Sequence, residues 1–234
     1  KVVAKSSELF LEQKGIRATE LQAHPELLQP LLDSQFDRLM LSLEKTRASG
    51  AFIIYDATAN ERLANAETSR AGLYIKSLEP NIVSVGALNM TILRGFADLG
   101  RDRDYALHAL WSMEFDLNSL PEYAELAGIS GRDGDLGEAF CWGEARPLPG
   151  SSELWMPCIV PLFDSNGDLF GVCGFEVSSM LFKLKYSPDT SHYKRMSCLI
   201  CSVDDEKLQL TGALSGGDYT RYTALAYKAW PKPS

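Results

Sequence analysis

The sequence contains no long apolar run, no excess of basic residues and no regular pattern of cysteines. No stretch approaches the roughly 20 apolar residues that cross a bilayer as a helix, and none has the pattern of a signal peptide. Lys and Arg number 23 against 31 Asp and Glu, so the net charge is −8. Because nucleic-acid phosphates are bound by clustered basic residues, which this chain lacks, the sequence disfavours a nucleic-acid partner.

The five cysteines are an odd number at scattered positions and predict no disulfide framework. Cys141, Cys158 and Cys173 stand in apolar, strand-like runs, where a free cysteine is typically a small buried hydrophobe. Cys198 and Cys201 have a spacing that points their side chains to opposite faces of a strand. No second pair completes a zinc site, so we expect neither a metal nor another cofactor.

The composition is ordinary for a folded protein, with 45% hydrophobic and 23% charged residues. The 234 residues suffice for one large domain or two small ones with a buried core. The sequence begins at Lys1 without an initiating Met and stops at Ser234. We therefore expect a fragment of a longer protein, with any membrane segment outside it.

The clearest local signal is a hairpin centred on Asn166-Gly167. Both residues tolerate the positive φ of a tight turn, and an apolar run lies on each side of them. The pattern predicts two antiparallel strands, 155–163 and 169–177, which carry apolar residues on both faces and so belong in the middle of a sheet. Pro161 cannot donate to a ladder, so we expect an irregularity there.

The remaining elements are predicted from apolar periodicity, with proline and glycine marking the boundaries. Two helical pieces are expected, with a kink or restart between residues 22 and 31: residues 6–21 and 26–46. Three strands join the hairpin to make five: 51–55, 71–78 and 139–142. Between them we expect helix over 89–117 with an interruption at 100–104, a helical turn at 120–123 and a loop at 128–137. The tail is predicted as a connecting helix at 179–186, a hairpin of 196–203 and 208–213, and a helix at 219–230.

The hairpin also carries a resemblance to a known family. Val160-Pro161-Leu162, then Asp164-x-x-Gly167, then Leu169-x-Gly171-Val172-x-Gly174-x-Glu176-Val177 resembles the last two strands of a Cache domain. Cache domains are the extracytoplasmic, PAS-like sensors of bacterial chemoreceptors and sensor kinases. The family usually has Asp followed by Ile or Leu where this chain has Glu176-Val177.

The resemblance implies an α+β fold in which a long N-terminal helix backs a PAS-like, five-stranded antiparallel sheet. A second, smaller PAS-like lobe follows, and at this length it is either a minimal lobe or one that lacks residues. The expected divisions are a kinked N-terminal helix, a membrane-distal lobe, and a connecting helix with the membrane-proximal lobe: 1–47, 48–178 and 179–234. The alternative for residues 1–47 is a helical hairpin packed on the core.

Catalysis is not indicated by the sequence. Ser191 and Lys194 match a Ser-x-x-Lys pattern, but the companion motifs of penicillin-recognising enzymes are absent and the pattern is common by chance. Cys141 and His108 form a conceivable pair, yet nothing in the sequence orients either residue. We therefore expect a binding module and not an enzyme.

Ligand pockets combine aromatic walls with a few convergent polar groups, and such residues concentrate between residues 70 and 164. The candidate ligand-binding residues are Arg70, Tyr74, Trp111, Tyr123, Trp142, Glu144, Trp155 and Asp164. For the aromatic residues the alternative is core packing, and for Asp164 it is turn formation. Amino-acid-binding Cache domains carry an Arg two residues before a Trp, and Ala109 stands there before Trp111.

The expected function is that of an extracytoplasmic, ligand-sensing domain of a bacterial transmembrane signalling protein. Its partners would be a small metabolite, such as a carboxylate or an amino acid, and a second copy of the chain. The membrane would be reached through segments outside the sequence. The alternative is an intracellular PAS-like or GAF-like regulatory module that mediates dimerisation without a small-molecule ligand.

Overall fold

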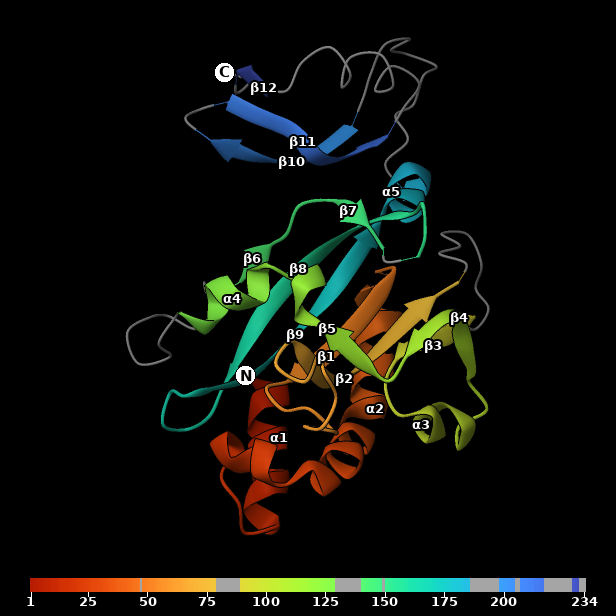
Figure 1. The fold of residues 1–234 in the computed structure, drawn as a ribbon. Helices are drawn as coiled ribbons and strands as arrows, with labels where there is room; N and C mark the ends of the chain where they lie inside the picture. Colours follow the sequence, from red (N-terminus) through yellow and green to blue (C-terminus); the bar gives the residue numbers. More distant parts are fainter. Residues whose placement is uncertain are drawn as a thin grey trace.

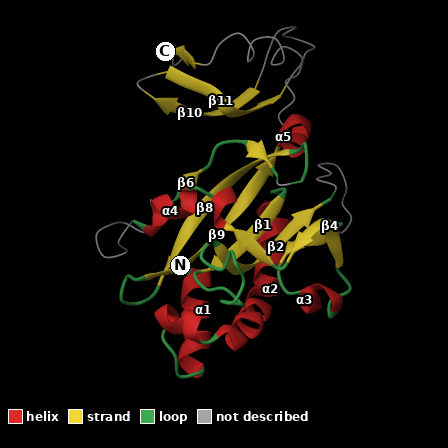
Figure 2. Cartoon of the chain, in the orientation of Figure 1, coloured by secondary structure: helices red, strands yellow, loops and turns green. Residues whose placement is uncertain are grey.

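The structure is a computed structural model, and it describes residues 1–46, 48–78, 89–128, 140–148, 150–185, 198–204, 207–216 and 229–231. Helices near the N-terminus pack on a large sheet, and a smaller sheet is formed by the C-terminal strands (Figure 1). Outside the N-terminal part, the described residues are mainly in strands and loops (Figure 2). None of the described helices combines the length and apolarity that crossing a membrane requires.

The N-terminal region forms two α-helices that lie side by side (Figure 1), with two short 3-10 turns between them: α1 Val2–Gln13, η1 Ala18–Ala23, η2 Pro25–Leu27 and α2 Leu28–Thr46. Gly15, with a φ of 77°, follows the end of α1. Pro25 and Pro30 both stand in first turns, where a missing N–H costs nothing. The long helix expected to back the sheet is α2.

Helices α1 and α2 do not form the single kinked helix that was predicted for residues 1–47. Ser6 in α1 donates a hydrogen bond to Gln35 in α2 over 2.9 Å, which holds the two helices against each other. Both helices contribute to the core on one face of the sheet. The arrangement therefore follows the helical-hairpin alternative, because folding α1 back buries Leu11 completely.

The five strands predicted from the sequence form one continuous antiparallel ribbon in the order β2-β1-β9-β8-β6. Their bounds are β1 Gly50–Tyr55, β2 Ser69–Ser77, β6 Cys141–Trp142, β8 Leu154–Phe163 and β9 Leu169–Ser178. Helix α2 packs against β1 and β2. The predicted α+β fold with a helix-backed sheet is confirmed.

The hairpin is central, as predicted, since β9 pairs with both β8 and β1. Its turn closes through Gly167, whose φ is 83°. The irregularity expected at Pro161 lies one residue further on, between Leu162 and Phe163, while Pro161 is in register with Val172.

The helix predicted over 89–117 is wrong. That segment forms β3 Met90–Arg94, the short α3 Ala97–Arg101, β4 Ala106–Ser112 and β5 Glu114–Asp116. β3 pairs with the free edge of β2, and β4 runs parallel to β3, so the complete sheet is mixed. Over short runs, apolar residues spaced three or four apart fit a helix or a strand. Here the segment forms strands because it pairs with the unoccupied edge of β2.

The connection to the hairpin contains a 3-10 turn, η3 Leu117–Ser119, then α4 Glu122–Ala127 and later β7 Arg146–Pro147. The helical turn predicted at 120–123 is confirmed by α4. Most of the predicted loop at 128–137 lies outside the described residues. β5 and β7 pair with β2 and β8, respectively.

After β9 the chain continues into α5 Ser179–Lys185 and a three-stranded sheet: β10 Cys198–Asp204, β11 Lys207–Gly216 and β12 Ala229–Pro231. The connecting helix and the hairpin are confirmed. The predicted helix at 219–230 is wrong at Ala229 and Trp230, which pair with β11, and its residues 219–228 lie outside the described part. Phe182 and Leu214 pack on Met156 of β8. The division into lobes at residue 178 stays a prediction.

Candidate functional site

The sheet has two covered faces. On one face, Ile53 of β1 and Leu73 of β2 pack on α1 and α2. On the other, Phe52, Tyr74 and Trp155 pack under a cover made of β5, η3 and α4. Successive strand residues point to opposite faces, so the sequence alternation assigns each side chain to one of these cores.

A pocket of about 110 Å³ opens on the face away from α1 and α2. Its lining residues come from β2, β3, β4, β5, η3 and β8 and the segments beside them: Tyr74, Arg94, Ser112, Glu114, Phe115, Asp116, Ser119, Leu148 and Trp155. We take this pocket as the candidate functional site, because it combines aromatic walls with polar side chains converging from several strands.

Three aromatic rings form the walls of the pocket. Tyr74 stacks on Phe115 with ring centroids 6.0 Å apart, and the Tyr74 and Trp155 centroids are 6.2 Å apart. The indole Nε1 of Trp155 is buried without a hydrogen-bond partner among the described residues. A buried N–H donor without an acceptor costs free energy, so this indole is held in place by its packing and not by a hydrogen bond.

Arg94 is the cationic group of the pocket. It stands at the end of β3, where a shift in register with β2 follows Ile92. Its Nη1 donates to the carbonyl oxygens of Leu93 and Leu110, at 2.7 and 2.8 Å. Among the described residues, no carboxylate oxygen lies within ion-pair distance of this guanidinium. Burial lowers the pKa of Arg94.

Beneath the pocket lies a buried ionic cluster. Glu176 on β9 is fully buried, accepts a hydrogen bond from the Tyr74 hydroxyl and forms an ion pair with Lys76. The Lys76 ammonium also lies 3.5 Å from a carboxylate oxygen of Glu153. Burial, together with the Glu176 carboxylate, raises the pKa of Tyr74. The Lys76 ammonium is thus shared by two carboxylates, and Glu176 holds the Tyr74 hydroxyl. Arg94 is the cation that lines the pocket itself.

The acidic groups at the pocket are already engaged. The carboxylate of Glu114 accepts hydrogen bonds from the hydroxyls of Thr58 and Ser69. Asp116 accepts from the backbone N–H of Asn118 at 3.0 Å, which caps η3. These hydrogen bonds occupy carboxylate oxygens without cancelling their charge, and Arg94 is the one cationic side chain among the described residues that line the pocket.

Two of the eight residues predicted from the sequence, Tyr74 and Trp155, line this pocket; the other six lie elsewhere. Arg70 forms an ion pair with Asp56, with 2.7 Å between Nε and Oδ1. The indole N–H of Trp111 donates to the Gly95 carbonyl at 3.0 Å, and its ring packs toward the helix-side core. Each of these two residues thus has a structural partner.

The remaining four also occupy structural or surface positions. Tyr123 of α4 packs in the core of the pocket-bearing face, and burial, with the nearby Asp56 carboxylate, raises its pKa. Trp142 is 49% exposed, and Glu144 is exposed beside Gly212. Asp164 Oδ1 accepts from the backbone N–H groups of Asn166 and Asp168, both at 2.9 Å, which matches the turn-forming alternative.

The catalytic candidates receive no support from the geometry. His108 Nδ1 accepts from the Leu110 N–H at 3.0 Å, and the Cys141 thiol lies 3.7 Å from Glu125. Each is thus engaged with a different neighbour. Ser191 and Lys194 lie outside the described residues.

Sequence reasoning missed Arg94, the most informative residue of the site. It was assigned to a helix, and no local motif marks it. The signal that was available is the run Met90–Arg94, in which β-branched and apolar residues precede Gly95. That run also fits a short strand ending in a charged residue.

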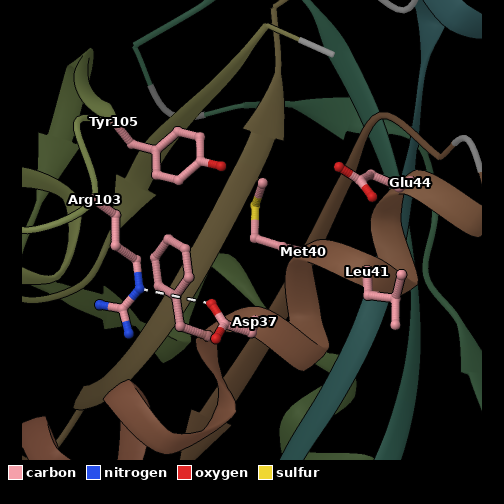
Figure 3. A pocket seen from close by; sticks show the side chains of 7 residues that line it. Asp37, Met40, Leu41, Glu44, Arg103 and Tyr105 are labelled. Carbon is pink, nitrogen blue, oxygen red and sulfur yellow. Dashed lines mark ion pairs between the residues drawn. The ribbon is translucent and has the colours of Figure 1, made fainter. Parts of the chain in front are cut away.

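A second, wider hollow lies outside α2 and has a volume of about 410 Å³. Figure 3 shows Met40 between Tyr105 on one side and Glu44 on the other. The cation of this hollow, Arg103, lies 2.7 Å from Asp33 and 3.7 Å from Asp37. Its guanidinium is thus compensated by two carboxylates, in contrast to that of Arg94.

No model of a known protein family matches the sequence, and no curated protein matches it. Among solved structures, the chain is similar to one described as Methyl-accepting Chemotaxis protein X, with 15% identity and a TM-score of 0.38, over 84% of this chain and 68% of that one. It is also similar to the periplasmic sensory domain of the Campylobacter jejuni chemoreceptor Tlp1, with 12% identity and a TM-score of 0.39, over 89% of this chain and 71% of that one. Both similarities are distant, and the proposals below depend on the residues of this chain.

Proposed function

We propose that the chain is an extracytoplasmic sensory domain of a membrane signalling protein and that it binds a small organic carboxylate in the pocket around Arg94. The observation that carries the proposal is a partly buried guanidinium that lines a cavity with aromatic walls and has no carboxylate partner among the described residues. A charge removed from water is stabilised by an opposite charge, and a planar carboxylate matches guanidinium geometry.

The size of the pocket restricts the ligand. A volume of about 110 Å³ fits a molecule of a few heavy atoms, such as acetate, lactate or pyruvate. Tyr74 and Phe115 provide flat apolar surfaces for its short carbon chain. Trp155 provides a third aromatic wall.

The ligand would act by joining elements that are distant in the sequence. Arg94 at the end of β3 already bonds the Leu110 carbonyl of β4, and Trp155 begins the hairpin that continues into α5. A ligand held between them favours one arrangement of these strands. To signal, it must bind that arrangement more tightly than the alternative one.

We expect one of these carboxylates to raise the thermal midpoint of the wild-type chain, because a ligand that binds only the folded state stabilises it by mass action. Arg94→Gln removes the cation while keeping polar atoms for the Leu93 and Leu110 carbonyls, and it should weaken binding by at least about tenfold. The measurement is a thermal-shift screen followed by calorimetric titration of wild type and variant.

Arg101→Gln is the matched control, since Arg101 is exposed on α3 and pairs only with Asp98 among the described residues. It should bind like wild type. The proposal is overturned if none of the carboxylates shifts the midpoint, or if a binding carboxylate is held equally well by the Arg94 variant. Selective stabilisation by a free amino acid that is insensitive to Arg94→Gln would likewise contradict it.

A further inference from the structure

A separate cavity of about 210 Å³ lies on the opposite face of the sheet, between the two N-terminal helices and strands β1, β8 and β9. Its walls are apolar and come from both layers, among them Leu39, Ile53, Val160 and Phe175. An apolar cavity of roughly 150 Å³ is large enough to bind benzene. This one therefore has room for a longer hydrocarbon chain.

The only charged side chain among the described residues lining this cavity is Arg38 of α2. Its Nη1 donates to Gln35 Oε1 at 2.6 Å and to the Ser6 hydroxyl, so two neighbours fix the position of the guanidinium. Gln35 is itself buried, at 3% exposure. In the described part of the chain, no carboxylate lies within ion-pair distance of Arg38.

Arg103 provides the contrast within the same helical layer. Its guanidinium is paired with Asp33 and covers the ring of Phe36. The hollow it borders also contains the carboxylates of Asp37 and Glu44 (Figure 3). Arg38 instead combines an uncompensated cation with an apolar cavity. A ligand that satisfies both features needs an anionic head and a hydrocarbon tail.

We infer that this cavity binds a medium-chain fatty acid, with its carboxylate at Arg38 and its chain between the helices and Val160 and Phe175. The site is distinct from the pocket around Arg94, which lies across the sheet and accommodates only a few heavy atoms. A ligand here would tie α2 to the β8–β9 hairpin.

Calorimetric titration of the whole chain with octanoate tests the inference. Wild type should bind octanoate saturably, and Arg38→Gln should weaken binding by about tenfold through loss of the charge-assisted bonds. Val160→Phe should weaken it too, by filling the cavity, so the inference stays testable even where the Arg38 variant folds poorly. Arg103→Gln is the matched control and should bind like wild type.

Thiol modification locates the bound chain. Cys158 and Cys173 line the cavity, whereas Cys141, Cys198 and Cys201 do not. Burial raises the pKa of Cys158, and it raises the pKa of Cys173 to about 11, so both thiols react slowly at neutral pH. Octanoate should slow their modification by a maleimide further, as measured by peptide mass spectrometry, and leave the other three rates unchanged.

The inference is overturned if octanoate does not bind saturably, or if Arg38→Gln and Val160→Phe both bind it like wild type. It is also overturned if Arg94→Gln abolishes octanoate binding while Arg38→Gln does not, which would place the ligand in the other pocket. A failure of this kind leaves the proposal for small carboxylates at Arg94 standing, because that proposal is tested with ligands too short to fill the cavity.

Discussion

Glu176 is fully buried on β9, and its charge is compensated by Lys76 of β2, which is 4% exposed. Tyr74 adds a hydrogen bond to the same carboxylate. Removing two charges from water is expensive, so such a pair gives little net stability, yet losing one partner leaves the other uncompensated. At the residue scale, we therefore expect the free energy of unfolding to fall strongly when only one member of the Lys76–Glu176 pair is replaced.

Lys76→Met keeps the apolar stem of the side chain and removes the ammonium group. We expect it to lower the free energy of unfolding by about 3–5 kcal/mol, because Glu176 is left buried without its cation. Urea denaturation at neutral pH measures the change.

The double variant Lys76→Met, Glu176→Gln should recover much of that loss, since the fully buried charge is gone and the remaining carboxylate, Glu153, is partly in contact with solvent. Arg101→Met, which removes the cation of an exposed ion pair, should cost no more than about 1 kcal/mol. A single Lys76→Met variant as stable as wild type would show that the buried pair does not contribute as described.

At the scale of elements, the β8–β9 hairpin organises the sheet through the close approach of its two strands. A Cβ added at Gly174 would lie 2.1 Å from the Cys158 carbonyl oxygen and 2.7 Å from the Phe52 ring. Strand β9 also pairs with β1, so it is held on both sides and cannot move away. Only glycine fits at this position.

Gly174→Ala should therefore destabilise the fold by about 1–3 kcal/mol or more through overpacking. Chemical denaturation followed by circular dichroism measures the loss. Gly128→Ala at the end of α4 is the control: its added Cβ would lie 3.5 Å from the Glu125 carbonyl oxygen, an ordinary contact. Equal stability of the two variants would contradict the tight strand packing.

At the scale of the whole molecule, the sheet buries aromatic hydroxyl groups in both of its cores. Tyr55 lies in the helix-side core, and Tyr74 and Tyr123 lie in the core on the other face. Burial raises the pKa of all three side chains above the ordinary value for tyrosine. In both cores, ionisation of a buried tyrosine is therefore coupled to unfolding.

This linkage predicts how stability changes in alkali. Below about pH 10 these tyrosines are protonated in both the folded and the unfolded chain, so their contribution is fully present. As pH rises above that value, the unfolded chain ionises first, and stability falls because burial disfavours the folded tyrosinates. We expect tyrosinate absorbance from these residues to appear together with the loss of circular dichroism.

Tyr123→Phe removes one of the three groups and should move the alkaline unfolding midpoint to higher pH. The linkage would be refuted if all nine tyrosines of the chain ionised in one step near pH 10 while the circular dichroism stayed unchanged.

Several parts of the fold could be predicted because their signals are local. Asn166-Gly167 fixed the turn, and the apolar alternation on either side fixed the two strands of the hairpin. Pro25 and Pro30 marked where the N-terminal helices restart. Tyr74 and Trp155 were identified as wall residues because large aromatic side chains on central strands face a core or a pocket.

The segment from Met90 to Ser112 could not be predicted in the same way. Its apolar spacing fits a helix as well as two short strands. Strands form because β3 pairs with the edge of β2 and β4 then pairs with β3. Arg94 reached the pocket only through that pairing. The turn-forming role of Asp164 could be predicted for the opposite reason, since it is local and depends on no distant residue.

By itself, the sequence determined the central hairpin, the positions of the five strands and the extent of the helix α2, because strand period and turn chemistry act over a few neighbouring residues. Their assembly into one antiparallel sheet was implied by the resemblance. Only the tertiary structure decided that α1 folds back beside α2, that β3 and β4 extend the sheet, and that Arg94 and Arg38 meet cavities on opposite faces. The physical reason is that pairing, burial and charge compensation join residues far apart in the chain. These interactions contribute free energy only after the strands have paired in the folded protein.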